Sequence, residues 1–293
     1  MDTVPYLFCD AVAETIAELR GISWQLGNIN WTVDANHPQF NSWKTSLEHH
    51  ALNRQLLKLY IAFSRGNWYY SIYKSGISIS FTEMKQIKTK YLQIRNVSFC
   101  SYPELHSQDT NLQEIEEIIR FTTPFMNLAT VFLYSEEMAE DDLSIMLSYY
   151  KNGQFCNIEV PHYRKCYEMF LKRHLQSIFM KSLVISGHLW SREVGLQIKI
   201  LMLRRSLKEV DCKDSNLVFD KTFFEELLKI WPKNKSATFR VVCSFGFEEL
   251  KEFRSVFPFI GELIWKREDG VTITAYKLWL ERTWQITMSA AVN

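Results

Sequence analysis

Residues 180–231 read MKSLVISGHLWSREVGLQIKILMLRRSLKEVDCKDSNLVFDKTFFEELLKIW. A short apolar run at 183–185 precedes an amphipathic segment at 190–203, and a second run at 207–212 precedes another amphipathic segment at 223–231. Short apolar runs favour strands, and apolar residues at helical spacing favour helices. The stretch therefore predicts strand–helix–strand–helix with a repeat of about 26 residues. We expect eight of its residues in the core: Leu183, Ile185, Ile198, Leu207, Val210, Phe223, Leu227 and Trp231.

The same pattern recurs on both sides of this stretch. Strand-like runs occur at residues 91–97, 128–133, 155–160, 181–186, 207–212 and 238–244, with helical patterns between them. Since each strand precedes a helix, the strands should be parallel. A period in the twenties to thirties is typical of stacked repeats. We therefore predict an α/β fold containing a leucine-rich-repeat-like solenoid with outer helices, in which Asn216 is nearest to a ladder asparagine.

Helix ends carry their own signals in the last unit. Thr222 and Glu225 match a capping box, and Pro232 follows as a stop. These residues predict a helix whose N-cap is Thr222.

Alternating patterns flank the repeats. Residues 57–63, 68–73 and 77–81 predict a small antiparallel meander, and Asp269-Gly270 between alternating segments predicts a β-hairpin. We expect four regions: 1–56, a helical segment; 57–90, a β-meander; 91–257, an irregular α/β repeat solenoid; and 258–293, a C-terminal hairpin cap.

Charge and cysteine usage restrict the partners and the compartment. The chain has 34 basic and 33 acidic residues among 293, so no overall field favours nucleic acid or an anionic membrane. Its six cysteines are scattered, which is typical of reduced thiols in the cytoplasm or nucleus. No apolar run reaches the roughly 18 residues that a membrane span needs. We expect protein partners, with no nucleic acid and no membrane.

Few residues point to catalysis. A glycine-rich phosphate loop is missing from the sequence, so we expect no nucleotide cofactor. The best metal-like set is Cys156, His162, Cys166 and His174, whose ligands suit zinc but whose spacing matches no familiar zinc site. A Cys–His nucleophilic pair in this region is a further alternative. We expect no catalytic residue, no cofactor and no metal, and keep a metal-dependent or cysteine-based enzyme using 156–174 as the alternative.

Several short motifs carry a resemblance to a known family. They are VPYLFCDAVAETI at the start, W-x3-L-x2-H followed by Asn53-Arg54, the blocks LVISGHLW, LKEVDCKDSNLVFD and FFEELLKIW, and a closing W-x-R-x-D-G at Trp265. In these motifs the chain resembles the large nematode family of F-box and F-box-associated-like proteins. Residues 5–20 also have helical apolar spacing, as an F-box helix requires.

The resemblance implies a partner and a role. F-box proteins dock on a Skp-type adaptor of a cullin–RING ubiquitin ligase through apolar helix positions, while the rest of the chain holds a substrate protein. Because residues 22–42 are polar and tryptophan-rich, the resemblance implies a degenerate F-box in the helical segment 1–56. The positions that the resemblance assigns to adaptor binding are Pro5, Leu7, Val12, Ile16 and Leu19.

Together these observations predict a non-enzymatic protein-interaction module, acting as a substrate-receptor subunit of a ubiquitin ligase. A repeat-type binding protein without a ligase link is the second alternative.

Overall fold

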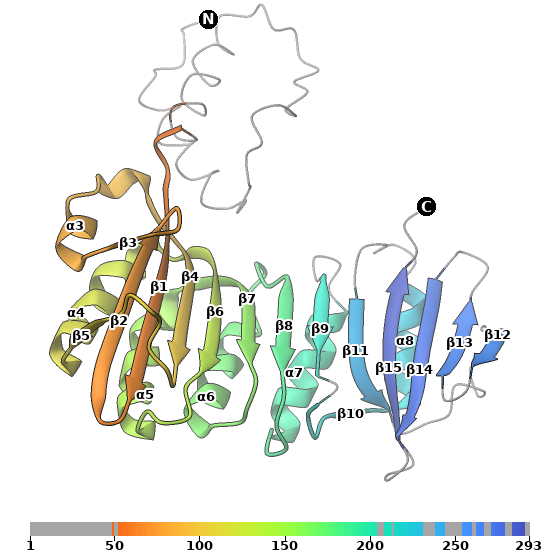
Figure 1. The fold of residues 1–293 in the computed structure, drawn as a ribbon. Coiled ribbons are helices and arrows are strands. Elements are labelled where there is room, and N and C mark those ends of the chain that lie inside the picture. Colours follow the sequence, from red (N-terminus) through yellow and green to blue (C-terminus); the bar gives the residue numbers. More distant parts are fainter. Residues whose placement is uncertain are drawn as a thin grey trace, which may run out of the picture. The chain divides into compact units, whose positions relative to one another are not determined.

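The computed structural model describes residues 49, 52–203, 208–212, 214–230, 238–243, 254–259, 262–266, 271–278 and 283–290. They form a mixed α/β fold built on a mostly parallel sheet with interleaved helices and an antiparallel N-terminal meander (Figure 1). The predicted α/β class is confirmed. The four predicted region boundaries stay predictions.

The chain divides into two compact units. The first consists of Met1–Thr130, Ser135–Met138 and Asn152–Gln154, and the second of Val131–Tyr134, Ala139–Lys151 and Phe155–Asn293. Strand β6, Asn127–Tyr134, contributes residues to both units.

The first unit begins with the predicted meander. Strands β1 (Gln55–Ser64), β2 (Asn67–Lys74) and β3 (Ile77–Ile79) pair antiparallel in succession. Both connections are two-residue turns in which each residue has positive φ, 52° and 85° in the first and 50° and 86° in the second. Gly66 and Gly76 supply the second position, where a side chain would be strained, and such turns match the twist of a hairpin.

The rest of the first unit extends this meander. Strand β4 (Leu92–Cys100) pairs parallel with β1, and β5 (Gln108–Thr110) pairs antiparallel with β2. Its helices are α3 (Phe81–Lys85) and α4 (Leu112–Thr122), with short turns η1 (Thr89–Tyr91) and η2 (Thr123–Phe125). Residue 81 was expected to end a strand, but Ser80 caps α3 through a capping box with Glu83, so the strand stops at Ile79.

In the second unit, strands alternate with helices as the repeat predicts. After β6 come β7 (Gln154–Val160), β8 (Ser182–Ile185), β9 (Glu209–Asp211), β10 (Val218–Phe219) and β11 (Thr238–Cys243). The helices are α5 (Glu140–Tyr149), α6 (Lys165–His174), α7 (Arg192–Met202) and α8 (Lys221–Ile230), with η3 (Tyr150–Asn152) after α5. Strand β7 pairs parallel with β8, β8 with β9, and β9 with β11, as expected.

Helices α5, α6 and α7 lie on the same side of strands β6 to β9 (Figure 1). The strand residues that face them are buried apolar side chains, such as Leu133, Ile158, Leu183 and Val210. The predicted core is correct for Leu183, Ile185, Ile198, Val210, Phe223 and Leu227, all at most 5% exposed. Leu207 and Trp231 lie outside the described residues.

Antiparallel strands close the second unit's sheet. Its order continues from β11 through β15 (Thr283–Ala290), β14 (Val271–Leu278) and β13 (Glu262–Lys266) to β12 (Arg254–Phe259). Strands β13 and β14 flank Asp269-Gly270 and pair antiparallel, as the sequence predicts.

The predicted cap of α8 is wrong. The helix begins at Lys221, and the backbone N–H of Phe223 donates to Oδ1 of Asp220 at 2.9 Å. Asp220 therefore satisfies an orphan N–H at the helix start, and Thr222 lies inside the first turn.

Candidate interaction surface

The sheet face opposite helices α5 to α7 in the second unit, which we call the strand face, gathers side chains from five strands. Alternation along each strand places them there, because their sequence neighbours are buried against the helices. The strand face consists of Phe132, Tyr134, Asn157, Glu159, Ser182, Val184, Glu209, Asp211 and Arg240.

Strand register arranges these residues in rows across the sheet. Asn157 pairs with Ser182, and Ser182 with Glu209. In the next row Glu159 pairs with Val184, Val184 with Asp211, and Asp211 with Arg240. Each row is therefore built from residues that lie about one repeat apart in the sequence.

Contacts along these rows hold the charged groups in place. The hydroxyl of Ser182 donates to Glu209 at 3.0 Å. Nη1 of Arg240 lies 2.9 Å from Asp211 Oδ2 and 3.7 Å from Glu209 Oε1. The hydrogen bond to Asp211 raises the pKa of the Arg240 guanidinium above its ordinary value. Three carboxylates accompany one guanidinium, so the strand face is acidic.

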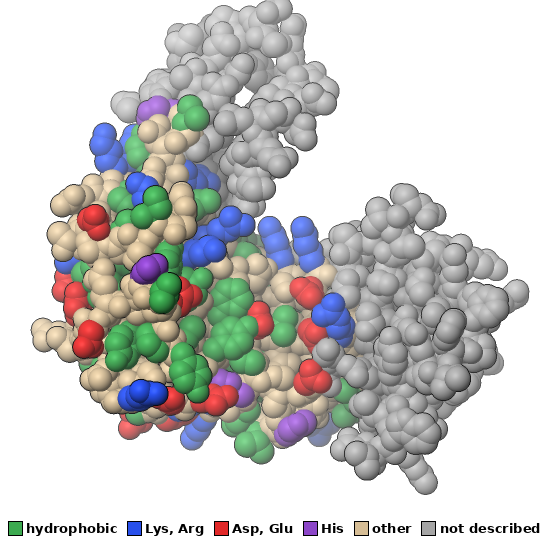
Figure 2. Space-filling model, viewed as in Figure 1, with side chains coloured by type: hydrophobic (Ala, Val, Ile, Leu, Met, Phe, Trp, Pro, Cys, Tyr) green, Lys and Arg blue, Asp and Glu red, His purple; other side chains and the backbone are tan. Residues whose placement is uncertain are grey.

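Aromatic rings adjoin the acidic groups. Phe132 and Tyr134 stack with their ring centroids 6.0 Å apart and their planes at 24°. The hydroxyl of Tyr134 donates to Glu159 of the next strand. Figure 2 shows hydrophobic and acidic side chains side by side on this part of the molecule. Rings beside satisfied carboxylates suit recognition of another molecule, since aromatic residues are enriched in protein interfaces.

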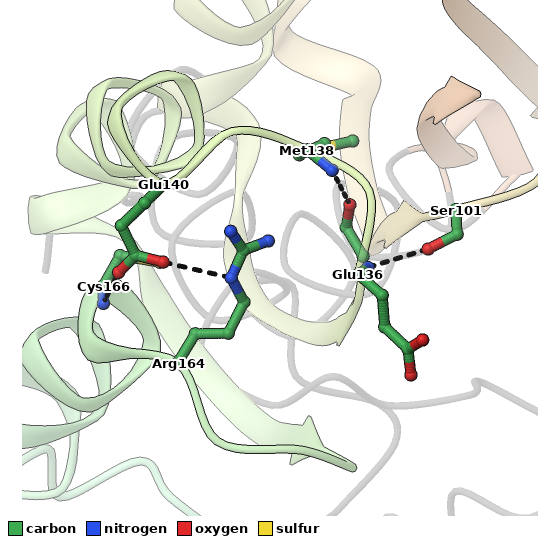
Figure 3. Close-up of polar contacts among 7 residues, drawn as sticks. Ser101, Glu136, Met138, Glu140, Arg164 and Cys166 are labelled. Atoms are coloured by element: carbon green, nitrogen blue, oxygen red, sulfur yellow. Dashed lines mark hydrogen bonds and ion pairs between the residues drawn. The ribbon is translucent and has the colours of Figure 1, made fainter. Parts of the chain in front are cut away.

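A carboxylate on the helical side connects α5 to the start of α6. Glu140, the first residue of α5, accepts hydrogen bonds from the Cys166 backbone N–H at 2.6 Å and from Arg164 Nε at 3.1 Å (Figure 3). Although burial acts to raise the pKa of Glu140, these hydrogen bonds prevail and lower it. Arg164, the N-cap of α6, makes no side-chain cap, so Glu140 performs that role from the preceding helix.

Two further hydrogen bonds lie in the first unit, in the segment between β6 and α5. There the Glu136 backbone N–H donates to Ser101 at 2.7 Å, and the Met138 N–H donates to Ser135 (Figure 3). Both contacts fix the turn that follows β6.

The alternative site at residues 156–174 separates into unrelated positions. Cys156 lies in β7, Cys166 in the first turn of α6 and His174 at its end, whereas His162 contacts the ring of Tyr167. Within the described part of the chain, no group of three or more His, Cys, Asp or Glu residues is arranged to hold a metal ion.

Two titrating groups of that region, Cys166 and His174, are in their neutral forms at pH 7. Burial, followed by the hydrogen bond with Glu140, raises the pKa of Cys166 to about 12. Burial and the charge of Arg173 lower the pKa of His174 to about 4. A protonated thiol is a poor nucleophile, and a thiolate is what cysteine catalysis requires. These pKa shifts disfavour Cys166 and His174 as a catalytic pair.

The five positions assigned to adaptor binding, Pro5, Leu7, Val12, Ile16 and Leu19, lie outside the described residues. Sequence reasoning missed the strand face as a set of named residues. The alternation within each strand could have indicated which side chains lie on this face. The rows across the sheet, however, appear only when the register between strands is known.

Comparison of the chain with protein-family models, with curated proteins and with solved structures gave no match. The resemblance to F-box proteins therefore stays a prediction. Among the described helices, none combines the length and the apolar character needed to cross a membrane.

Proposed function

We propose that this chain is a non-enzymatic protein-interaction module that binds a protein ligand on its strand face. The observation that carries the proposal is the surface itself: stacked aromatic rings beside carboxylates that are already hydrogen-bonded. Such a surface offers binding area without leaving charged groups unpaired. Its acidic excess favours a ligand with basic side chains.

The proposed architecture of this module is a leucine-rich-repeat-like solenoid. Contacts between residues one repeat apart support it. The side chain of Asn216 accepts from the Trp190 N–H and donates to the Trp190 carbonyl, both at 3.0 Å and 26 positions away. Asn216 thereby joins successive turns, as a ladder asparagine does in stacked repeats.

We further propose that the chain is a substrate-receptor subunit of a cullin–RING ubiquitin ligase. In this proposal the ligand on the strand face is the substrate, and residues 5–20 bind a Skp-type adaptor. The helical apolar spacing of those residues and the family resemblance support it.

Affinity capture of the tagged full chain, followed by mass spectrometry, tests both parts. We expect the double variant Tyr134→Ala, Val184→Asp to recover the substrate at least about tenfold less than the wild type, because interface centres contribute most of the binding energy. Met169→Asp on α6 is the matched control, since Met169 is 63% exposed on the helical side. Val12→Asp with Ile16→Asp should abolish co-purification with the adaptor and leave substrate capture intact.

Four results would contradict the proposal. Equal capture by the wild type and by the Tyr134, Val184 variant would reject the strand face. Loss of capture in Met169→Asp would place binding on the helices. Failure of the wild type to co-purify with a co-expressed adaptor, or unchanged adaptor binding after the Val12, Ile16 changes, would reject the ligase link alone.

A further inference from the structure

A second feature lies in the first unit and shares no residue with the strand face. A pocket of about 460 Å³ opens where β1, β2 and β4 adjoin. Its lining includes Lys58, Tyr60, Tyr73, Arg95 and Glu104.

A β-bulge brings Arg95 into the pocket. Strand β1 pairs Leu57 with Ile94 and then Lys58 with Asn96, so Arg95 has no partner in β1. Bulges re-aim a side chain, and they are over-represented next to functional sites. Here the bulge adds an exposed guanidinium to the sheet face that already carries Lys58.

The two cations of the pocket are available to a ligand. Within the described residues, neither Lys58 nor Arg95 forms an ion pair with a carboxylate. A guanidinium presents a planar fork that matches a carboxylate, and an ammonium adds a mobile point charge. Both side chains are exposed, so a ligand reaches them without displacing the core.

The carboxylate of the pocket already has a partner. Tyr73 donates a hydrogen bond to Glu104, and burial together with this contact raises the pKa of the Tyr73 hydroxyl. Tyr60 packs edge-to-face on Tyr73 with ring centroids 5.6 Å apart. Ser71 next to these rings contacts Ser107 at 2.8 Å, which ties the loop containing Glu104 to β2. The site therefore keeps a net positive charge.

We propose that this pocket is an anion-binding subsite that receives the carboxylate of an Asp or Glu side chain from an acidic segment of the protein ligand. The inference rests on the proposed function, because the carboxylate comes from the kind of protein ligand proposed there. A monoanion fits better than a phosphate dianion, because one carboxylate neutralises the net charge of +1 at this exposed site, whereas a dianion would leave an excess negative charge beside Glu104.

Fluorescence anisotropy with the full chain tests the subsite. The ligand is a fluorescein-labelled Gly-Ser peptide carrying two adjacent Glu residues, and its partner peptide has Gln at both positions. We expect the Glu peptide to bind about tenfold more tightly, as one charge-assisted hydrogen-bonding contact allows. Arg95→Ala and Lys58→Ala should each remove most of this preference, and Arg95→Lys should retain part of it.

The control variant is Lys151→Ala, which removes an exposed cation in the second unit. Binding of the Glu peptide should be unchanged in it. Equal affinity for the two peptides, or equal losses in Lys151→Ala and Arg95→Ala, would overturn the subsite. Displacement by inorganic phosphate at a tenfold lower concentration than acetate would overturn its assignment to a carboxylate.

The strand-face variant Tyr134→Ala, Val184→Asp separates this inference from the proposed function. We expect that variant to bind the Glu peptide as the wild type does. A normal peptide preference together with equal ligand capture by the wild type and the strand-face variant overturns the proposed function alone. Ligand capture that is lost in the strand-face variant, with no peptide preference in the wild type, overturns the subsite alone.

Discussion

His174 is a histidine held neutral inside an apolar environment. Its ring contacts Phe155 and Phe170 at centroid distances of 4.9 and 4.4 Å, and its Nε2 is buried with no hydrogen-bond partner in the structure. Burial and the nearby charge of Arg173 lower its pKa from 6.5 to about 4. His174 is therefore best explained as a packed core residue between aromatic rings.

The depressed pKa of His174 makes stability depend on pH. In the unfolded chain the ring takes up its proton near pH 6.5, and in the folded chain only near pH 4. The unfolded state therefore binds more protons in this range, and the free energy of unfolding should fall by up to about 3 kcal/mol as pH drops from 6.5 to 4. Urea denaturation at pH 7 and pH 4.5 measures this fall.

His174→Phe removes the titrating group and should flatten the pH dependence. His106→Gln, at an exposed position, is the control and should behave as the wild type does. An unchanged pH dependence in His174→Phe would show that other groups cause the acid sensitivity.

At the scale of elements, Asn216 links the loop after β9 to the segment between β8 and α7. Its side chain bonds both the N–H and the carbonyl of Trp190, and its backbone N–H donates to Gly187 at 3.2 Å. Asn216→Ala should lower the free energy of unfolding by about 1–2 kcal/mol, because the backbone groups of Trp190 lose their partner. The amide of Trp190 should then exchange its hydrogen faster.

Asn216→Asp provides a graded comparison. It keeps an acceptor for the Trp190 N–H and loses the donor to the carbonyl, so its stability should fall between those of the wild type and Asn216→Ala. If the amide hydrogen of Trp190 exchanges at the same rate in all three proteins, the side chain of Asn216 does not stabilise the backbone at Trp190.

The elements that the sequence predicted well are those with local signals. Apolar runs and helical spacing identify β7, β8, α7 and α8 because each pattern lies within one segment. Helix ends are harder, since Asp220 and Thr222 are both capping residues two positions apart and only the geometry selects Asp220.

The parts of the sites that the sequence did not predict depend on register. In the sequence alone, nothing distinguishes Arg95 from other strand residues. The pairing of β1 with β4 shows that Arg95 has no register partner in β1. In the same way, Glu159, Val184 and Asp211 are about 25 residues apart in sequence and become a row only across paired strands. Long-range pairing is not encoded in any single stretch of the sequence.

At the scale of the whole molecule, we propose that the two sides of the second unit have different roles. On the helical side, contacts such as that between Glu140 and Cys166 join neighbouring helices, and in our proposal the strand face binds the protein ligand. This division predicts that the ligand lies close to the strand face and far from the helices.

Site-specific photo-crosslinking tests this division most directly. A benzophenone amino acid is placed at Val184 on the strand face or at Met169 on α6, in the full chain and in the presence of its captured ligand. We predict a crosslinked ligand from position 184 and none from position 169. Crosslinks from position 169 alone would contradict the account.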